Sequence, residues 1–182
     1  MKTLLTFALS VTIAQLCFAQ SEPSKIELTK ADYEKIANYA VWRTDYYICT
    51  GIAFAKSIGK SPNSFTNFAA QTHVQSFNPK QFNLKNGREK IESLVKTINF
   101  IITNYPGGKF EVVSDTKNSV QVKMNRAYRI YFEKGPILEV SLEEFENYLW
   151  GHIKIMFAEL GVKFDYEIGP DEISASFTSI EK

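Results

Sequence analysis

The chain has 182 residues, of which 45% are hydrophobic, and its 21 Lys and Arg nearly balance its 20 Asp and Glu. This length and composition favour one globular domain with a hydrophobic core. A neutral chain lacks the positive excess that attracts nucleic acid or anionic membranes, so we expect neither as a partner.

The first 19 residues have the pattern of a secretory signal peptide. Lys2 supplies a positive start, an apolar run follows from 4 to 16, and Ala19 ends a small-x-small exit. The apolar run has about 13 residues, short of the roughly 20 that cross a bilayer. We therefore expect cleavage after Ala19 and a secreted or periplasmic protein with no membrane anchor. A short tether over 20–28 would then precede a single domain over 29–182.

Residues 29–59 are predicted to form one long helix at the centre of the molecule. Thr29 and Asp32 have capping-box spacing, and Gly59 before Pro62 provides the end signal. Apolar residues occur on more than one side of this helix, which is typical of a helix buried among others. They form two rows, namely Tyr33, Ile36, Ala37, Ala40, Val41, Tyr47, Ile48, Ile52 and Ala55, and beside it Tyr39, Trp42, Tyr46, Cys49 and Ala53.

Two further helices are expected next. Ser61 before Pro62 starts one of them, with His73 on its flank, and Asn78 before Pro79 ends it. The next follows Asn86 and carries apolar residues at helical spacing up to Tyr105, where a Pro-Gly-Gly sequence closes it.

The period then changes from 3.6 to 2, which predicts strands over 110–114 and from Val120 onward. Ser141 and Glu144 form a capping box for a fourth helix, which ends at Gly161. Alternating residues over 162–168 and 173–177 predict a terminal hairpin. The fold class is therefore α+β, with three N-terminal helices and then an antiparallel sheet of four to five strands interrupted by a fourth helix.

The order of predicted helices and strands from about 105 to 180 resembles that of a known protein family. The segments concerned are 108–113, 120–132, the helix 144–160 with Gly151 inside it, and the closing strands around 172–177. This order resembles the four-vinyl reductase / aminothiazoline-carboxylate hydrolase-like group, which implies a hydrolase as an alternative function. Members with a proposed metal or catalytic role carry cysteines in this block, whereas the corresponding stretches here, 124–127 and 169–172, carry none.

Few residues suit metal or nucleophilic chemistry. His73 and His152 are the only histidines, and Cys49 is the only cysteine after the signal peptide. None of them has a ligand-like local spacing, so we expect no metal and no cofactor. We interpret each histidine as a core or boundary residue and Cys49 as a small buried hydrophobe. Tertiary packing that brought the three together would change this interpretation.

Arg126 has two interpretations. If the strand runs unbroken from Val120 to Phe132, Arg126 lies on its apolar face and needs a carboxylate, either from a helix, such as Asp45, or from a ligand. A bulge or bend at 125–127 would instead turn it to solvent. Arg43 and Asp45 similarly lie either at the exposed edge of the first helix or facing a cavity.

These observations favour an exported, non-enzymatic protein that binds a small apolar or acidic ligand between its helices and its sheet. The candidate ligand-binding residues are Trp42, Tyr46, Arg126 and His152. A hydrolase of the resembled group is one alternative. A protein-interaction module that pairs through its aromatic surface or Cys49 is another.

Overall fold

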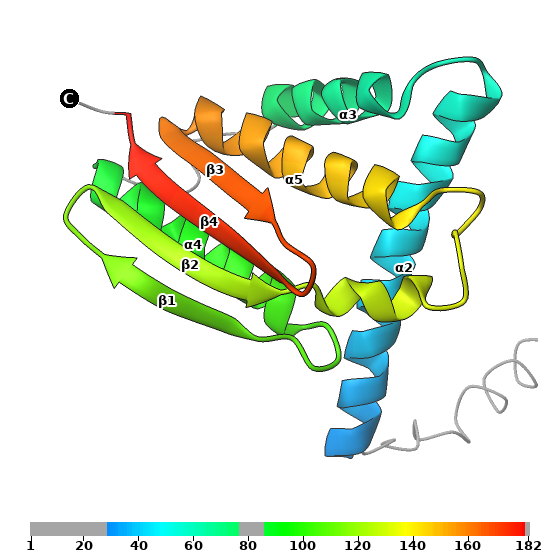
Figure 1. Cartoon of the computed structure of the whole chain (residues 1–182), viewed down its shortest axis with the longest axis horizontal. Coiled ribbons are helices and arrows are strands. Elements are labelled where there is room, and N and C mark those ends of the chain that lie inside the picture. The colour runs from blue at the N-terminus through cyan, green and yellow to red at the C-terminus, as the bar shows by residue number, and fades with distance from the viewer. Residues whose placement is uncertain (1–28, 77–85, 181–182) are drawn as a thin grey trace, which may run out of the picture. The chain divides into compact units, whose positions relative to one another are not determined.

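The computed structural model describes residues 29–76 and 86–180, so the predicted signal peptide and tether lie outside the described residues. The chain divides into two compact units, 1–34 and 35–182. Their described part contains, in chain order, three helices, two strands, a short 3₁₀ helix, a fourth helix and two strands. The fold is therefore α+β, as predicted (Figure 1).

The helix boundaries follow the local end signals. Helix α2 (Lys30–Ser57) begins at the Thr29 cap, whose hydroxyl accepts from the Asp32 N–H. It ends where Gly59 adopts a φ of 73°. Helices α3 (Pro62–Ser76) and α4 (Gly87–Thr103) begin after Ser61 and Asn86. The predicted end of the second helix at Asn78 lies outside the described residues.

The sheet has four antiparallel strands in the order β1-β2-β4-β3. They are β1 (Phe110–Asp115), β2 (Ser119–Asn125), β3 (Val162–Ile168) and β4 (Glu172–Ser179). Helix α5 (Leu142–Glu159) separates the two hairpins in the chain and starts with the predicted Ser141–Glu144 capping box. The terminal hairpin is confirmed, with Phe164 paired to Phe177.

One face of the sheet carries the core, and α4 and α5 cover it (Figure 1). Alternation along β2 buries Val120, Val122 and Met124 and leaves Gln121 and Lys123 exposed, because successive side chains point to opposite faces. The predicted inner face of α4 is buried at Ile91, Leu94, Ile98 and Ile102. On α5 the sequence analysis missed the buried Trp150 and Glu146.

Strand β2 does not continue to Phe132. It ends at Asn125, whose side chain accepts from the Lys109 N–H and donates to the Gly107 carbonyl. Residues Ala127–Phe132 then form the 3₁₀ helix η2. The bend is confirmed, and the common apolar face expected from Val120 to Phe132 is lost because Tyr128 is buried whereas Ile130 is exposed.

The central position expected for the first helix is wrong for its first half. Residues 35–40 are all exposed, and in the second half α2 buries Asp45, Cys49, Ile52 and Ala55. Tyr39 and Tyr47 are more than half exposed. The apolar pattern of α2 therefore covers two sides, of which the described chain buries one.

None of the helices in the described part of the chain is both long and apolar enough to cross a membrane.

Candidate functional site

An open pocket of about 550 Å³ lies between η2 and the segment that leads into α5. Its volume is within the range of small-molecule sites. Its walls combine polar and apolar surface, and they include two arginines and one glutamate. The lining residues are Arg126, Ala127, Arg129, Ile130, Phe132, Glu133, Gly135, Pro136, Ser141 and Leu142.

A strained turn borders this pocket. Ile137 and Val140 exchange backbone hydrogen bonds of 3.1 and 2.9 Å, and between them Leu138 and Glu139 have φ values of 50° and 63°. Two consecutive positive φ values normally require Asn or Gly, so side chains as large as Leu and Glu carry a conformational cost here. Such strain persists only where the surrounding structure holds it in place.

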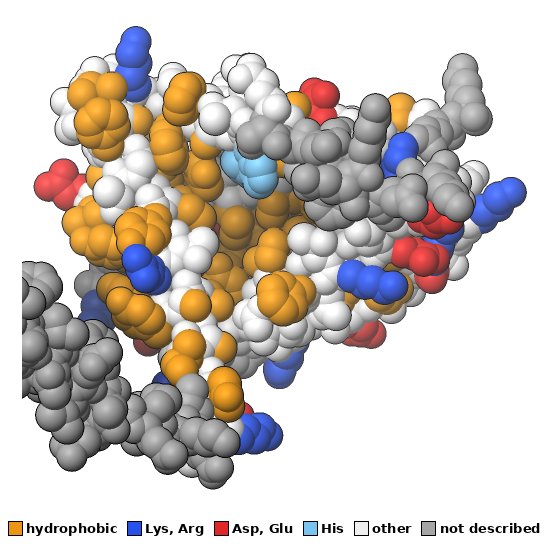
Figure 2. Space-filling model, turned by 180° about the vertical axis from the view of Figure 1, so that it is seen from behind, with side chains coloured by type: hydrophobic (Ala, Val, Ile, Leu, Met, Phe, Trp, Pro, Cys, Tyr) orange, Lys and Arg blue, Asp and Glu red, His pale blue; other side chains and the backbone are white. Residues whose placement is uncertain are grey.

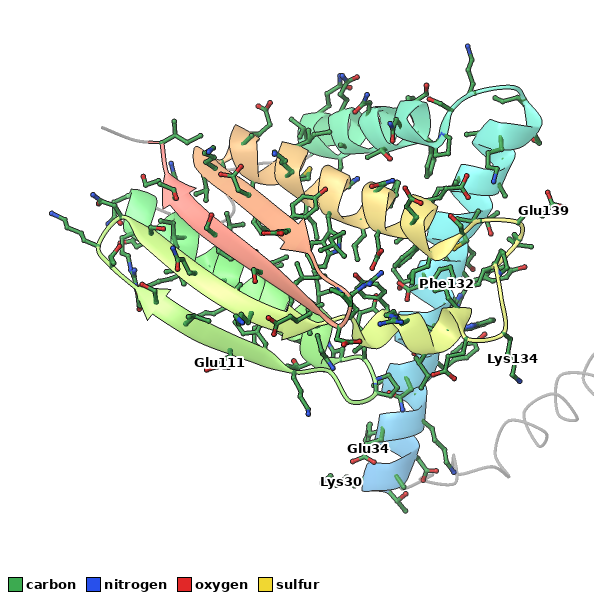
Figure 3. The ribbon with its side chains drawn as sticks, viewed as in Figure 1. Lys30, Glu34, Glu111, Phe132, Lys134 and Glu139 are labelled. Carbon is green, nitrogen blue, oxygen red and sulfur yellow. The ribbon has the colours of Figure 1, made fainter. Side chains whose placement is uncertain are left out.

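Lys56 at the end of α2 holds this turn. Its ammonium donates to the Glu139 carbonyl at 2.8 Å and to Glu144 at 2.9 Å. Burial alone would raise the pKa of Glu144, but Lys56 and the Ser141 N–H hold that pKa below its ordinary value. Figure 3 shows Phe132 between η2 and α5, whereas the Lys134 and Glu139 side chains point away from the fold.

Arg126 is paired with a carboxylate from a helix, as one of the two interpretations requires, but the carboxylate is that of Glu146 and not that of Asp45. Its Nε and Nη2 donate to the two carboxylate oxygens of Glu146 at 2.7 Å each, and its Nη1 donates to the carbonyls of Gly169 and Pro170. The pairing with Asp45 and the solvent position are both wrong, because the bend turns Arg126 toward α5. Burial opposes its charge, yet the Glu146 carboxylate keeps the pKa of Arg126 above its ordinary value.

The Arg126–Glu146 pair extends into the core. Tyr128 donates its hydroxyl to Glu146 at 2.7 Å, and the Trp150 indole N–H donates to the Tyr128 hydroxyl at 3.2 Å. Burial and the Glu146 charge raise the pKa of Tyr128. Every member of this network has a partner, which makes it a structural tie between η2, α5 and the β3–β4 turn.

Arg129 is the guanidinium that the sequence analysis missed. Its Nη1 donates to the Pro170 carbonyl at 2.7 Å and lies 3.4 Å from Asp171, and 46% of its side chain is exposed. The alternation of apolar and polar residues around Arg129 predicts a strand. Arg129 lines the pocket only because the chain turns into η2 at this point.

A second buried carboxylate, Asp45, lies on α2. It accepts from the Tyr105 hydroxyl at 2.9 Å, but its other oxygen and the Tyr131 hydroxyl have no hydrogen-bond partner among the described residues. Burial raises the pKa of Asp45 to about 7. Of the two positions considered for Asp45 and Arg43, Asp45 takes the buried one, whereas Arg43 lies at the exposed edge, bonded to the Tyr47 hydroxyl.

Neither Trp42 nor Tyr46 lines the pocket to which Arg126 belongs. Their rings stack on each other at 5.4 Å along α2, and Trp42 is 38% exposed. The walls of the pocket beside Arg126 come from η2 and the segment before α5. Of the four candidate ligand-binding residues, Arg126 alone lines this pocket.

His152 and His73 meet across α3 and α5, with 3.1 Å between His152 Nε2 and His73 Nδ1. Burial and the neighbouring ring lower the pKa of His152. Cys49 is fully buried, and burial raises the pKa of its thiol to about 12, so it stays protonated at neutral pH. No group of three or more metal-ligating side chains occurs within 29–76 and 86–180.

No protein-family model, curated protein or solved structure matches this chain. The resemblance to the four-vinyl reductase / aminothiazoline-carboxylate hydrolase-like group therefore stays a prediction.

Proposed function

We propose that the protein binds, without catalysis, a small and largely apolar molecule that carries one carboxylate. The observation that supports this most is the pocket of about 550 Å³, whose walls combine apolar side chains with the half-exposed Arg129. Apolar pockets with a few placed polar groups are the usual form of small-molecule sites.

Arg129, rather than Arg126, is the expected contact for the carboxylate. Arg126 already uses its three nitrogens on Glu146 and two carbonyls. Arg129 uses Nη1, and a guanidinium offers five N–H donors in a planar fork that matches a carboxylate. The apolar part of the ligand would then lie along Ile130, Phe132 and Leu142.

The strained turn at Leu138–Glu139 supports the same location. Strained backbone clusters at ligand-binding and catalytic sites, and here it borders the pocket and is held by Lys56. The turn thereby fixes the position of Pro136 and Ser141, which line the pocket.

Calorimetric titration with octanoate and with 1-octanol tests the proposal, since the two probes share a chain and differ in charge. We expect octanoate to bind more tightly, and Arg129→Met to weaken octanoate by about tenfold or more, because a hydrogen bond to a charged group contributes about 1.5–3 kcal/mol. Lys134→Met is the matched control, since that lysine is close in sequence but its side chain points away from the fold (Figure 3).

Two results would contradict the proposal. One is equal affinity for octanoate and octanol, and the other is an equal loss of octanoate affinity in the Arg129 and Lys134 variants. Native mass spectrometry of the purified protein would in addition report any small molecule that it retains.

The same proposal includes export, which the pattern of residues 1–19 supports. The hydrolase alternative has the resemblance as its support, and the protonated, buried Cys49 does not suit a nucleophile. A second candidate function, protein interaction, is favoured by the exposed apolar side of α2.

A further inference from the structure

Helix α2 carries a second apolar stripe on the side opposite its buried residues. We define this stripe as Ile36, Ala40, Tyr47, Phe54 and Ile58, all of which are exposed. At 3.6 residues per turn they lie within about 40° of one another around the helix, whereas Asp45, Cys49 and Ile52 point the other way. In Figure 2, hydrophobic side chains follow α2 on the left of the view.

The stripe is too apolar to suit a free surface. Tyr47 is 56% exposed and Phe54 is 63% exposed, and the spacing of seven residues between Ala40, Tyr47 and Phe54 is that of helices which pack on a further helix. Helices draw most of their stability from packing an apolar side, and contiguous exposed apolar surface marks interaction sites.

The order of residues along the stripe is symmetric about Tyr47. Ile36 and Ile58 stand eleven residues to either side of it, and Ala40 and Phe54 stand seven residues to either side. In a two-fold interface, residue i contacts residue j and j contacts i. Two antiparallel copies of α2 related by an axis at Tyr47 therefore place the large Phe54 against the small Ala40, and Ile36 against Ile58. We propose that the protein forms a two-fold dimer through this antiparallel pairing of α2.

Charge favours the antiparallel orientation. Arg43 lies beside the stripe, where its Nε and Nη2 donate to the Tyr47 hydroxyl at 3.0 and 2.8 Å. In a parallel pair the two copies of Arg43 would face each other. In the antiparallel pair they are separated by about 12 Å along the helix axis, at about 1.5 Å per residue, which exceeds the screening length of about 8 Å at physiological salt.

The flanks of the stripe add no unpaired polar group. Thr44 and Thr50 each donate the hydroxyl to a carbonyl one turn earlier in α2, at 2.9 and 2.8 Å, so their methyl groups remain for contact. The four large side chains of the stripe are each about half exposed and contribute roughly 100 Å² each, which gives about 400 Å² per copy. The total of about 800 Å² is below the size of stable specific interfaces, so we expect a weak dimer that dissociates at micromolar concentration or above.

Sedimentation equilibrium of the protein from micromolar to near-millimolar concentration tests the dimer. Tyr47→Lys places two ammonium groups face to face at the axis beside Arg43, with no carboxylate in the stripe to pair them, and should raise the dissociation constant by at least about a hundredfold. The matched control is Phe68→Lys, which introduces the same charge at an exposed aromatic of α3 outside the stripe and should leave the constant unchanged. Both sites are exposed, and circular dichroism checks that both variants fold.

Orientation is tested by disulfide formation between two variants. A mixture of Ile36→Cys and Ile58→Cys chains should cross-link to each other faster than either variant to itself. A protein that stays monomeric throughout the concentration range overturns the proposal. So does a dimer that Tyr47→Lys and Phe68→Lys weaken equally, or binding of the stripe to phosphatidylcholine–phosphatidylglycerol vesicles in place of self-association.

Discussion

Glu146 and Asp45 are both buried carboxylates on helices, yet their surroundings differ. Glu146 accepts two hydrogen bonds from Arg126 and one from Tyr128. Asp45 accepts one, from Tyr105, and its second oxygen has no hydrogen-bond partner in the described part of the chain. A buried charge is tolerated when its hydrogen-bonding capacity is met, and otherwise the group tends to take up a proton. Glu146 therefore belongs to a structural pair with Arg126, whereas we expect Asp45 to titrate near neutral pH.

The largest expected effect comes from breaking the paired site. Arg126→Met leaves Glu146 buried without its cation, so the free energy of unfolding should fall by about 3–5 kcal/mol in urea denaturation. The exposed pair Lys123–Glu172 provides the control, because Lys123→Met should leave the unfolding midpoint nearly unchanged. Replacing both partners, as Arg126→Met with Glu146→Leu, should recover most of the loss. If Arg126→Met unfolded at the same urea concentration as the wild type, the Arg126–Glu146 pair would not stabilise the fold.

The next effect concerns the pH dependence that Asp45 causes. In the unfolded chain its pKa has the ordinary value of 3.8, whereas burial raises the pKa of Asp45 in the folded protein to about 7. Between these values the folded state binds the extra proton, so its stability decreases as pH rises from about 4 to about 7 and is then constant. Asp45→Asn should remove this slope.

Thermal unfolding of both proteins across this pH range measures the Asp45 effect. At about 1.4 kcal/mol per pKa unit, the two curves should diverge by at most about 4 kcal/mol at pH 7 and above. Parallel curves for the wild type and Asp45→Asn would mean that another group causes the slope.

The smallest effect compares two tyrosines of η2. The Tyr128 hydroxyl joins Glu146 to Trp150, whereas the Tyr131 hydroxyl is a buried group with no partner among the residues described. Tyr128→Phe should therefore lower the free energy of unfolding by about 1–3 kcal/mol, and Tyr131→Phe should leave it unchanged or raise it slightly. An equal loss of unfolding free energy in the two variants would indicate that the Tyr131 hydroxyl has a hydrogen-bond partner in solution.

The candidate site could be predicted only in part from the sequence, because its buried charges are paired by residues of different segments. The sequence leaves Arg126 either as an inward charge that needs a carboxylate or as a residue turned to solvent, because the apolar pattern around it is visible in one segment but the bend is not. Its partner Glu146 was not recognised, since Glu146 looks like an ordinary exposed residue of a helix until η2 turns toward it. Arg129, Asp45 and the meeting of His73 with His152 depend in the same way on segments far apart in the chain.

The sequence by itself determined the helix ends, the strand alternation and hence the α+β class, because caps, glycine turns and side-chain periodicity act within a few residues. Thr29, Ser141 and Gly59 do in the structure what their neighbours in the chain predict. Only the tertiary structure decided which side of α2 is covered, where β2 turns into η2 and which carboxylate is paired. These outcomes depend on how groups far apart in the chain compete for burial and for hydrogen bonds. That competition cannot be predicted from any single segment of the sequence.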